Sequence, residues 1–329
     1  MDTRTKRFSR GNLFRTIGII ILLFLVFFTV LPYFIALPQY DENSSPKPFS
    51  NSAYSVVDGI KLHYQEWNAD EQNPTGKILL VHGFYGSTFT WRKNVSALIE
   101  KGFYVIAVDM PGFGYSSKKS RINHSLDSRA TLLWDFIDKL DRNYEAGKDL
   151  RWVLAGHSLG SAVISKMALQ RQDDIDKLIL VAPAINNSSN NNFSFLLADP
   201  VFKRWTAIFA EYFFFRKDNI KGFLASAYGR DPTQEEIEGY LNPIRQPGTS
   251  IAAGDIVSTG QSRVDLSKIK IPTQIIKGEK DSWVQSSEVQ KVKNDLEFSI
   301  IYEIKNAGHV PQETHEEEFN KTLINFLSI

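Results

Sequence analysis

The distribution of apolar residues divides the chain into one long apolar segment near its start and a body with short, recurring apolar runs. Residues 16–37 carry no charged side chain, whereas most later apolar runs span only three to five residues. A helix needs about 20 apolar residues to cross the hydrocarbon core of a bilayer, and this segment is long enough. The pattern therefore predicts one transmembrane helix at residues 16–37, so that the lipid bilayer is an expected partner.

The charges beside this segment indicate its orientation. Residues 1–15 contain five basic residues and one acidic residue. A basic flank stays in the cytoplasm, so we expect a cytoplasmic tail, a single membrane pass and an extracytoplasmic body. The alternative is a cleaved signal peptide, but those have shorter apolar regions that end in small residues, unlike Phe34 and Leu37. Residues 38–51 are polar and contain prolines, which is typical of a linker.

The body shows the alternation of strands and helices that an α/β protein requires. Two β-like runs flank Asp58-Gly59, which predicts a hairpin. Short apolar runs without alternation then indicate buried parallel strands at 78–81, 104–108, 152–155, 178–181, 274–276 and 300–302. Helical spacing of apolar residues occurs at 126–140, 162–169 and 316–327. Residues 52–185 and 264–329 are thus expected to form one mostly parallel, doubly wound sheet.

Residues 186–263 interrupt this alternation, because no strand pattern occurs in them. They begin with a run of Asn and Ser, continue with aromatic residues at helical spacing, and contain a helix-start pattern at Thr233. We expect a helical lid inserted into the α/β body. Its aromatic residues line an apolar acyl pocket, face a bilayer, or pack the lid onto the core.

Composition excludes several functions. The 38 basic and 37 acidic residues nearly cancel, which gives no general attraction to nucleic acid. The absence of cysteine excludes disulfides, thiol catalysis, iron–sulfur clusters and cysteine-based zinc sites. The six histidines lack H-E-x-x-H spacing, so we expect no metal and no cofactor. The sequence leaves the oligomeric state open.

The segment Gly156-His157-Ser158-Leu159-Gly160 matches the pattern G-x-S-x-G between a predicted strand and a predicted helix. A sharp strand-to-helix turn needs small residues at both ends, and it exposes the serine hydroxyl at the edge of the sheet. Ser158 is therefore the candidate nucleophile, and an inert serine in a tight turn is the alternative.

A serine nucleophile needs a base and a group that orients the base. His309 follows the predicted strand at 300–302, and Asp281 follows the one at 274–276. These positions lie beyond the carboxyl ends of parallel strands, where open α/β sheets bind ligands. We expect His309 as base and Asp281 as acid, with Glu279 as the second choice of acid.

Backbone N–H groups are the expected stabilisers of an oxyanion. Phe84 lies in the turn His82-Gly83-Phe84-Tyr85-Gly86 after the strand at 78–81, and Leu159 begins the helix after Ser158. His82 and His157 are expected to be structural, with His157 pointing away from the site. The remaining histidines, His63, His124 and His315, are expected on the surface.

These motifs together resemble the α/β-hydrolase superfamily. The matching segments are His82-Gly83-Phe84, residues 109–116, residues 156–160, residues 278–281 and Gly308-His309. The resemblance is to the lidded subgroup that includes esterases, monoacylglycerol lipases, C–C bond hydrolases, proline iminopeptidases, epoxide hydrolases and haloalkane dehalogenases. It implies a structural turn at residues 109–116. Epoxide hydrolases and haloalkane dehalogenases of this subgroup use an aspartate where this chain has Ser158, so neither activity is expected.

The resemblance implies a serine hydrolase that cleaves small-molecule esters, with apolar or lipid-like acyl groups favoured by the anchor. Expected substrate contacts are Tyr85, Phe202, Trp205, Phe209, Trp283 and Val310. Further candidates in the lid are Phe193, Phe195, Phe213, Phe214 and Phe215. Three alternatives remain. They are a C–C bond hydrolase, a proline iminopeptidase that uses Glu235, Glu236 and Glu238 for the substrate amine, and a catalytically silent surface binding protein.

Overall fold

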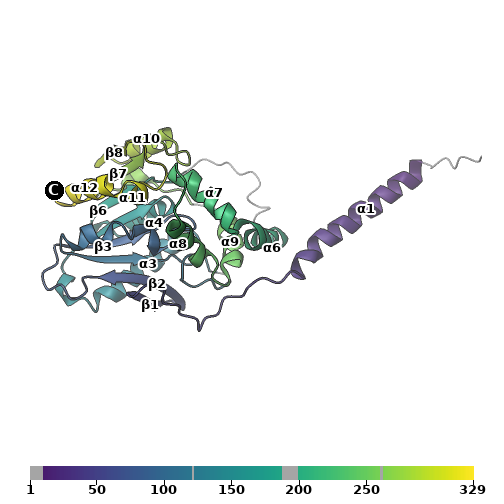
Figure 1. The fold of residues 1–329 in the computed structure, drawn as a ribbon, viewed down its shortest axis with the longest axis horizontal. Coiled ribbons are helices and arrows are strands. Elements are labelled where there is room, and N and C mark those ends of the chain that lie inside the picture. The colour runs from purple at the N-terminus through teal and green to yellow at the C-terminus, as the bar shows by residue number, and fades with distance from the viewer. Residues whose placement is uncertain (1–9, 121, 187–198, 260–261) are drawn as a thin grey trace, which may run out of the picture.

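One eight-stranded sheet forms the centre of the body (Figure 1). The computed structural model describes residues 10–120, 122–186, 199–259 and 262–329. The strands in chain order are β1 (Ser52–Val57), β2 (Ile60–Trp67), β3 (Gly76–Val81), β4 (Phe103–Val108), β5 (Trp152–His157), β6 (Ile175–Val181), β7 (Thr273–Gly278) and β8 (Ser299–Ile304). Their order across the sheet is β1-β2-β4-β3-β5-β6-β7-β8, and all pairs from β4 to β8 are parallel. The predicted mostly parallel sheet is confirmed.

Helices cover both faces of the sheet, because successive strand residues point to opposite sides. On β3, Leu79 and Val81 belong to one apolar cluster, while Ile78 and Leu80 belong to the other. The first cluster includes α3 (Leu126–Asp141), α4 (Leu159–Gln170) and α10 (Ser286–Asp295). The second includes α2 (Val95–Ile99) and α12 (Glu316–Leu327). The short helix α11 (Pro311–Thr314) connects β8 to α12.

The two ends of the sheet differ. At one end β1 pairs antiparallel with β2 across Asp58 and Gly59, whose positive φ values of 49° and 74° are those of a tight hairpin turn. The predicted hairpin is therefore present. At the other end, β8 was expected to be buried, but only its first and last residues are. Because β8 is the edge strand, Ile300, Ile301 and Tyr302 remain exposed.

Between β6 and β7 the chain leaves the sheet, and we call residues 199–259 of this stretch the helical insertion. It contains α6 (Pro200–Phe209), a π-helical turn (Ala210–Phe214), α7 (Lys217–Tyr228), α8 (Gln234–Ile244) and α9 (Thr249–Ser258), and no strand. Thr233 caps α8 as expected, in a capping box with Glu236. Phe193 and Phe195 lie outside the described residues.

The N-terminal helix α1 (Arg10–Val30) projects away from the body (Figure 1). The segment Leu13–Tyr33, which contains most of α1, has a mean hydropathy of 2.6 and is exposed over most of its length. It is therefore apolar and long enough to cross a membrane. A signal sequence passes the same test. The residues after the helix contact the body. Leu37 is buried against the insertion, and the Gly248 N–H donates to the Pro38 carbonyl at 3.0 Å.

Candidate active site

Ser158 occupies a strained turn between β5 and α4. Its φ of 51° and ψ of −114° are unfavourable for a residue with a side chain. Small neighbours make the turn possible, since a Cβ on Gly156 would lie 2.5 Å from the backbone of Gly160, and one on Gly160 would lie 2.6 Å from the His82 carbonyl. The Ser158 N–H donates to the Val181 carbonyl at 2.8 Å, which ties the turn to β6.

Asp281 and His309 form a buried pair at the ends of the two neighbouring strands β7 and β8. His309 Nδ1 lies 2.9 Å from Asp281 Oδ2. The other carboxylate oxygen, Oδ1, accepts the N–H groups of Trp283 at 2.8 Å and Val284 at 3.0 Å. Burial alone would raise the pKa of Asp281, but the bond from His309 and these N–H groups outweigh it and hold that pKa below its usual value.

An ionised Asp281 fixes the proton on His309. Because the carboxylate only accepts hydrogen bonds, Nδ1 of His309 must donate, which leaves Nε2 as the basic nitrogen. Glu279, the second choice of acid, instead accepts the Asn306 N–H at 2.9 Å. Of the two expected acids, the structure brings only Asp281 to His309.

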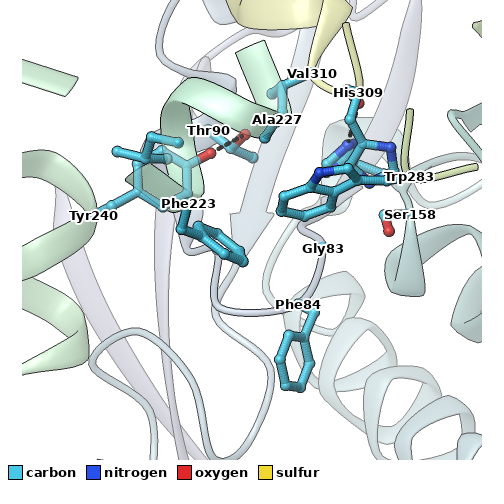
Figure 2. A pocket seen from close by; sticks show the side chains of 13 residues that line it. Gly83, Phe84, Thr90, Ser158, Phe223, Ala227, Tyr240, Trp283, His309 and Val310 are labelled. Atoms are coloured by element: carbon cyan, nitrogen blue, oxygen red, sulfur yellow. Dashed lines mark hydrogen bonds between the residues drawn. The ribbon is translucent and has the colours of Figure 1, made fainter. Parts of the chain in front are cut away.

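Ser158 and His309 line one apolar cavity of about 150 Å³ (Figure 2). The core contributes Gly83, Phe84, Gly86, Thr90, His157, Ser158, Trp283, His309 and Val310, and the insertion contributes Phe223, Leu224, Ala227 and Tyr240. Figure 2 shows Ser158 at one end, beside His309 and Trp283, and the hydroxyls of Tyr240 and Thr90 at the other. A group that reacts with Ser158 would therefore extend along apolar side chains toward two hydroxyls.

The two residues expected to stabilise an oxyanion are Leu159, directly after Ser158, and Phe84, which lines the same cavity. Leu159 is the first residue of α4, and Phe84 lies in the turn after β3. Neither N–H donates to any acceptor within the described part of the chain. An N–H at the start of a helix has no partner inside that helix and sits at the positive end of its dipole. Both N–H groups are thus without an acceptor in the described ranges, and their role at an oxyanion stays a prediction.

The last turn of α7 contacts both loops that carry the Asp281–His309 pair. Ser226 Oγ accepts the Trp283 indole N–H at 3.0 Å, and the Ala227 carbonyl accepts the His309 N–H at 2.7 Å. A Cβ on Gly308 would overlap the Ala227 carbonyl, so this close approach requires glycine at 308. The insertion therefore holds the histidine and the loop of its carboxylate in place.

Glu313 forms a second connection between the insertion and the core, four residues after His309. Its fully buried carboxylate accepts the hydroxyls of Thr90 at 2.6 Å, Tyr240 at 2.5 Å and Tyr228 at 2.9 Å. The guanidinium of Arg92 supplies the opposite charge at 2.5 Å. Burial and the charge of Glu313 raise the pKa of Tyr240 far above its usual value, so its hydroxyl stays protonated as a donor.

The expected substrate contacts divide into two groups. Trp283 and Val310 line the cavity, as does Phe84. Phe202, Trp205 and Phe209 do not, and that expectation was wrong; they lie on α6, where Trp205 stacks on Phe28 of α1 with 5.3 Å between ring centroids. Tyr85 is also absent from the lining, because its ring is buried behind Phe84 at 4.3 Å.

Sequence reasoning missed five cavity residues from distant segments, namely Thr90, Phe223, Leu224, Ala227 and Tyr240. No motif surrounds them, and only packing of the insertion on the core brings them to Ser158. The amine-binding carboxylates considered for a peptidase do not reach the cavity. None of Glu235, Glu236 and Glu238 lines it, and Glu236 pairs with Arg230 at 2.7 Å.

Two histidines expected on the surface are buried. His63 bonds Asp109 at 2.8 Å and Ser52 at 2.9 Å, and His124 is 5% exposed. Asp109 also accepts the N–H groups of Thr88 and Tyr115, which makes residues 109–116 a structural turn.

The two histidines expected to be structural are both buried. Burial lowers the pKa of His82 to about 4 and that of His157 to about 3, so both rings are neutral at pH 7. His157 does not point away from the site as expected. It lines the cavity and donates from Nε2 to the His309 carbonyl at 2.9 Å. No group of three or more His, Asp or Glu side chains suited to a metal occurs in the ranges that the structure describes.

Comparison with known proteins places this geometry in a family. The family model for the alpha/beta hydrolase fold matches residues 77–316. The uncharacterized hydrolase YugF of Bacillus subtilis (strain 168) is 26% identical over 282 residues, which are 83% of this chain and 96% of that protein. The pimeloyl-[acyl-carrier protein] methyl ester esterase of Vibrio atlanticus (strain LGP32) is 26% identical over 268 residues, 79% of this chain and 96% of that protein.

Bifunctional epoxide hydrolase 2 of Rattus norvegicus is 25% identical over 325 residues, which are 86% of this chain and 56% of that longer protein. Among solved structures, a serine hydrolase involved in carbazole degradation has a TM-score of 0.68 at 21% identity and covers 84% of this chain and 98% of its own. A membrane phospholipase A has a TM-score of 0.67 at 20% identity and covers 95% and 97%. At these identities the structures show the fold alone. Because the family model matches well over half of its residues, this chain belongs to the α/β-hydrolase family.

Proposed function

We propose that this chain is a membrane-anchored serine hydrolase that cleaves carboxylic esters through an acyl-enzyme. The observation that carries the proposal is that Ser158 and the Asp281–His309 pair meet at one apolar cavity. Asp281 orients the imidazole and stabilises its charged form, and the free Nε2 of His309 is the base. The relative from Vibrio is named as an ester hydrolase, which agrees with acyl chemistry.

The reaction uses only groups of this chain and water. Ser158 Oγ bonds to the ester carbonyl carbon while its proton moves to His309 Nε2. The N–H groups of Phe84 and Leu159 donate to the oxyanion, and removal of one such donor costs about 3–4 kcal/mol of barrier in related chemistry. His309 then protonates the departing alkoxide. Water then attacks the acyl carbon and gives a proton to His309 Nε2. As the bond between the acyl carbon and Ser158 Oγ breaks, His309 returns that proton to Ser158 Oγ, and the carboxylic acid is released.

The cavity supports an apolar acyl or alcohol group of limited size. Cavities for drug-sized ligands are about 300–1,000 Å³, whereas this one holds about 150 Å³. A short acyl chain fits with the insertion as placed, and a long chain requires α7 to move from Ser158. We expect turnover to fall with acyl length in solution. Lipid-like esters become substrates where the insertion can shift.

The membrane part of the proposal rests on α1. The apolar segment Leu13–Tyr33, which contains most of α1, has the length and hydropathy of a membrane span. The basic residues at the start of the chain favour a cytoplasmic N-terminus. The body then lies outside the cytoplasm. Proteolysis of intact cells tests this orientation, because an extracytoplasmic body is digested while a cytoplasmic body is protected.

The test of the chemistry is labelling by a fluorophosphonate together with turnover of short p-nitrophenyl esters. We expect Ser158→Ala to abolish labelling and to lower kcat about a million-fold, as loss of a nucleophilic serine does elsewhere. Ser267→Ala, at an exposed position of the short 3-10 helix Leu266–Lys268, is the matched control and should label fully. Unchanged turnover in a folded Ser158→Ala protein would refute the assignment. Absence of labelling in the unaltered protein would favour the silent binding protein.

A further inference from the structure

The exposed side of the helical insertion carries an aromatic surface next to α1. It is formed by Phe202, Phe209, Tyr212 and Phe213, which we call the aromatic face. Phe209 and Phe213 are each more than half exposed, and their rings lie 4.9 Å apart. The spacing of the four residues places them along one side of a helix. Large exposed apolar surfaces of this kind mark contacts with partners or membranes.

α1 fixes the depth of this surface. The rings of Phe202 and Trp205 contact Phe28, with centroid distances of 6.0 and 5.3 Å. Phe28 precedes Tyr33, the end of the apolar span, by five positions, or about 7 Å along a helix. If Leu13–Tyr33 crosses the bilayer, Phe28 lies within the hydrocarbon boundary, and the side chains that touch it share its depth.

Hydrogen bonds show why α6 suits this position. Pro32 has no N–H for the Phe28 carbonyl four residues earlier, and the Trp205 indole supplies that bond at 3.0 Å. Arg204 donates to the carbonyls of Pro32 at 3.0 Å and Ile35 at 2.7 Å. In a bilayer, where water cannot replace a lost partner, satisfaction of these helix-end carbonyls is especially valuable.

We propose that the aromatic face of the insertion lies in the outer interfacial layer of the lipid bilayer, as a second membrane contact beside α1. Phe209 and Phe213 then enter the lipid, and the exposed Tyr33 and Phe34 lie at the end of the adjoining span. Aromatic side chains favour this layer. The inference rests on the anchoring part of the proposed function.

This contact also indicates where substrate comes from. The π-helical turn with Phe213 leads within a few residues into α7, which supplies Phe223, Leu224 and Ala227 to the cavity wall. Lipid contact at one end of this segment is therefore linked through about ten residues of chain to the wall beside Ser158. Esters dissolved in the bilayer are the substrate class that this arrangement favours.

The absence of cysteine makes a clean test possible. Single variants of the full-length chain, Phe209→Cys and Phe213→Cys, carry an environment-sensitive fluorophore in phosphatidylcholine vesicles at high lipid excess. Some vesicles contain nitroxide-labelled lipids as quenchers. The control is Phe298→Cys, which is similarly exposed but lies just before the edge strand β8. Leu23→Cys in α1 is the positive control. Circular dichroism checks the fold of each variant.

We expect lipid nitroxides to quench positions 209, 213 and 23 several-fold more strongly than position 298. If the fluorophores at positions 209 and 213 are quenched no more than the one at position 298, while the one at position 23 is quenched, the inference is overturned and the anchor remains. Self-quenching between labels at 213 without lipid quenching would mean that a second copy covers the face, and would also overturn it. If position 23 is unquenched, both the anchor and this inference fail. If the unaltered full-length chain hydrolyses no ester while positions 209 and 213 are quenched by lipid, only the proposed chemistry is refuted.

Discussion

The loops at the carboxyl ends of the strands and the helical insertion form the two halves of the same cavity by different means. At the carboxyl ends of the strands, Ser158, Asp281 and His309 each follow a parallel strand within a few residues. Tight backbone contacts fix these turns. The insertion is held by side chains that reach distant partners, such as Tyr228 and Tyr240 on Glu313. A local motif can describe the first arrangement, whereas the second exists only after folding.

After loss of the nucleophile itself, the largest effect is expected at the carboxylate that follows β7. Asp281→Asn should lower kcat about 10⁴-fold, because an amide at this position favours the wrong histidine tautomer. Glu279→Gln is the matched control, since Glu279 bonds Asn306 rather than His309, and it should keep nearly full activity. Steady-state kinetics on a short ester measures both. If Glu279→Gln is the damaging change, the acid is wrongly assigned.

The same substitution should act oppositely in the two regions. Gly160→Ala places a methyl group against the carbonyl oxygens of Val81 and His82, and should lower the free energy of unfolding by about 3 kcal/mol. Gly222→Ala, in α7, meets no atom within 4 Å and should raise that free energy by about 0.5–1 kcal/mol through better helix propensity. Urea unfolding measures the free energy of unfolding of both variants. Equal changes in the two would contradict the difference between the two regions.

A smaller effect is expected where the insertion meets the core. Glu313→Gln removes the charge that faces Arg92 and weakens the bonds from three hydroxyls, so it should lower the free energy of unfolding by about 2 kcal/mol. It should also lower kcat, because Tyr228 and the neighbouring Ala227 hold the His309 loop. Thermal unfolding and kinetics test both. Full stability with full activity would show that the contact does not matter.

The smallest effect is expected from a single hydroxyl of that contact. Tyr228→Phe keeps the ring and loses one bond to Glu313, which should cost about 1 kcal/mol of unfolding free energy. Because the Ala227–His309 backbone bond remains, kcat should change less than in Glu313→Gln. A loss as large as that of Glu313→Gln would assign most of the stabilisation to this one hydroxyl.

Comparison of expectation with structure shows where local patterns stop being informative. The hairpin at Asp58-Gly59, the sheet and the helices of the insertion followed from periodicity and turn residues. The exposure of β8 did not, since a strand's place at an edge depends on the order of the whole sheet. The aromatic residues of α6 were wrongly assigned to the cavity, because their helical spacing shows a common face without naming its neighbour. The catalytic roles and domain boundaries stay predictions.

The sequence by itself determined the α/β body, the apolar N-terminal helix and the turn that presents Ser158. These depend on spacing within a few residues, where covalent geometry and local sterics decide. Only the tertiary structure decided that Asp281 rather than Glu279 faces His309, that Tyr240 and Thr90 close the cavity, and that Trp205 packs on Phe28. Such pairs lie tens to hundreds of residues apart, and their distances follow from how the layers pack, which no local pattern encodes.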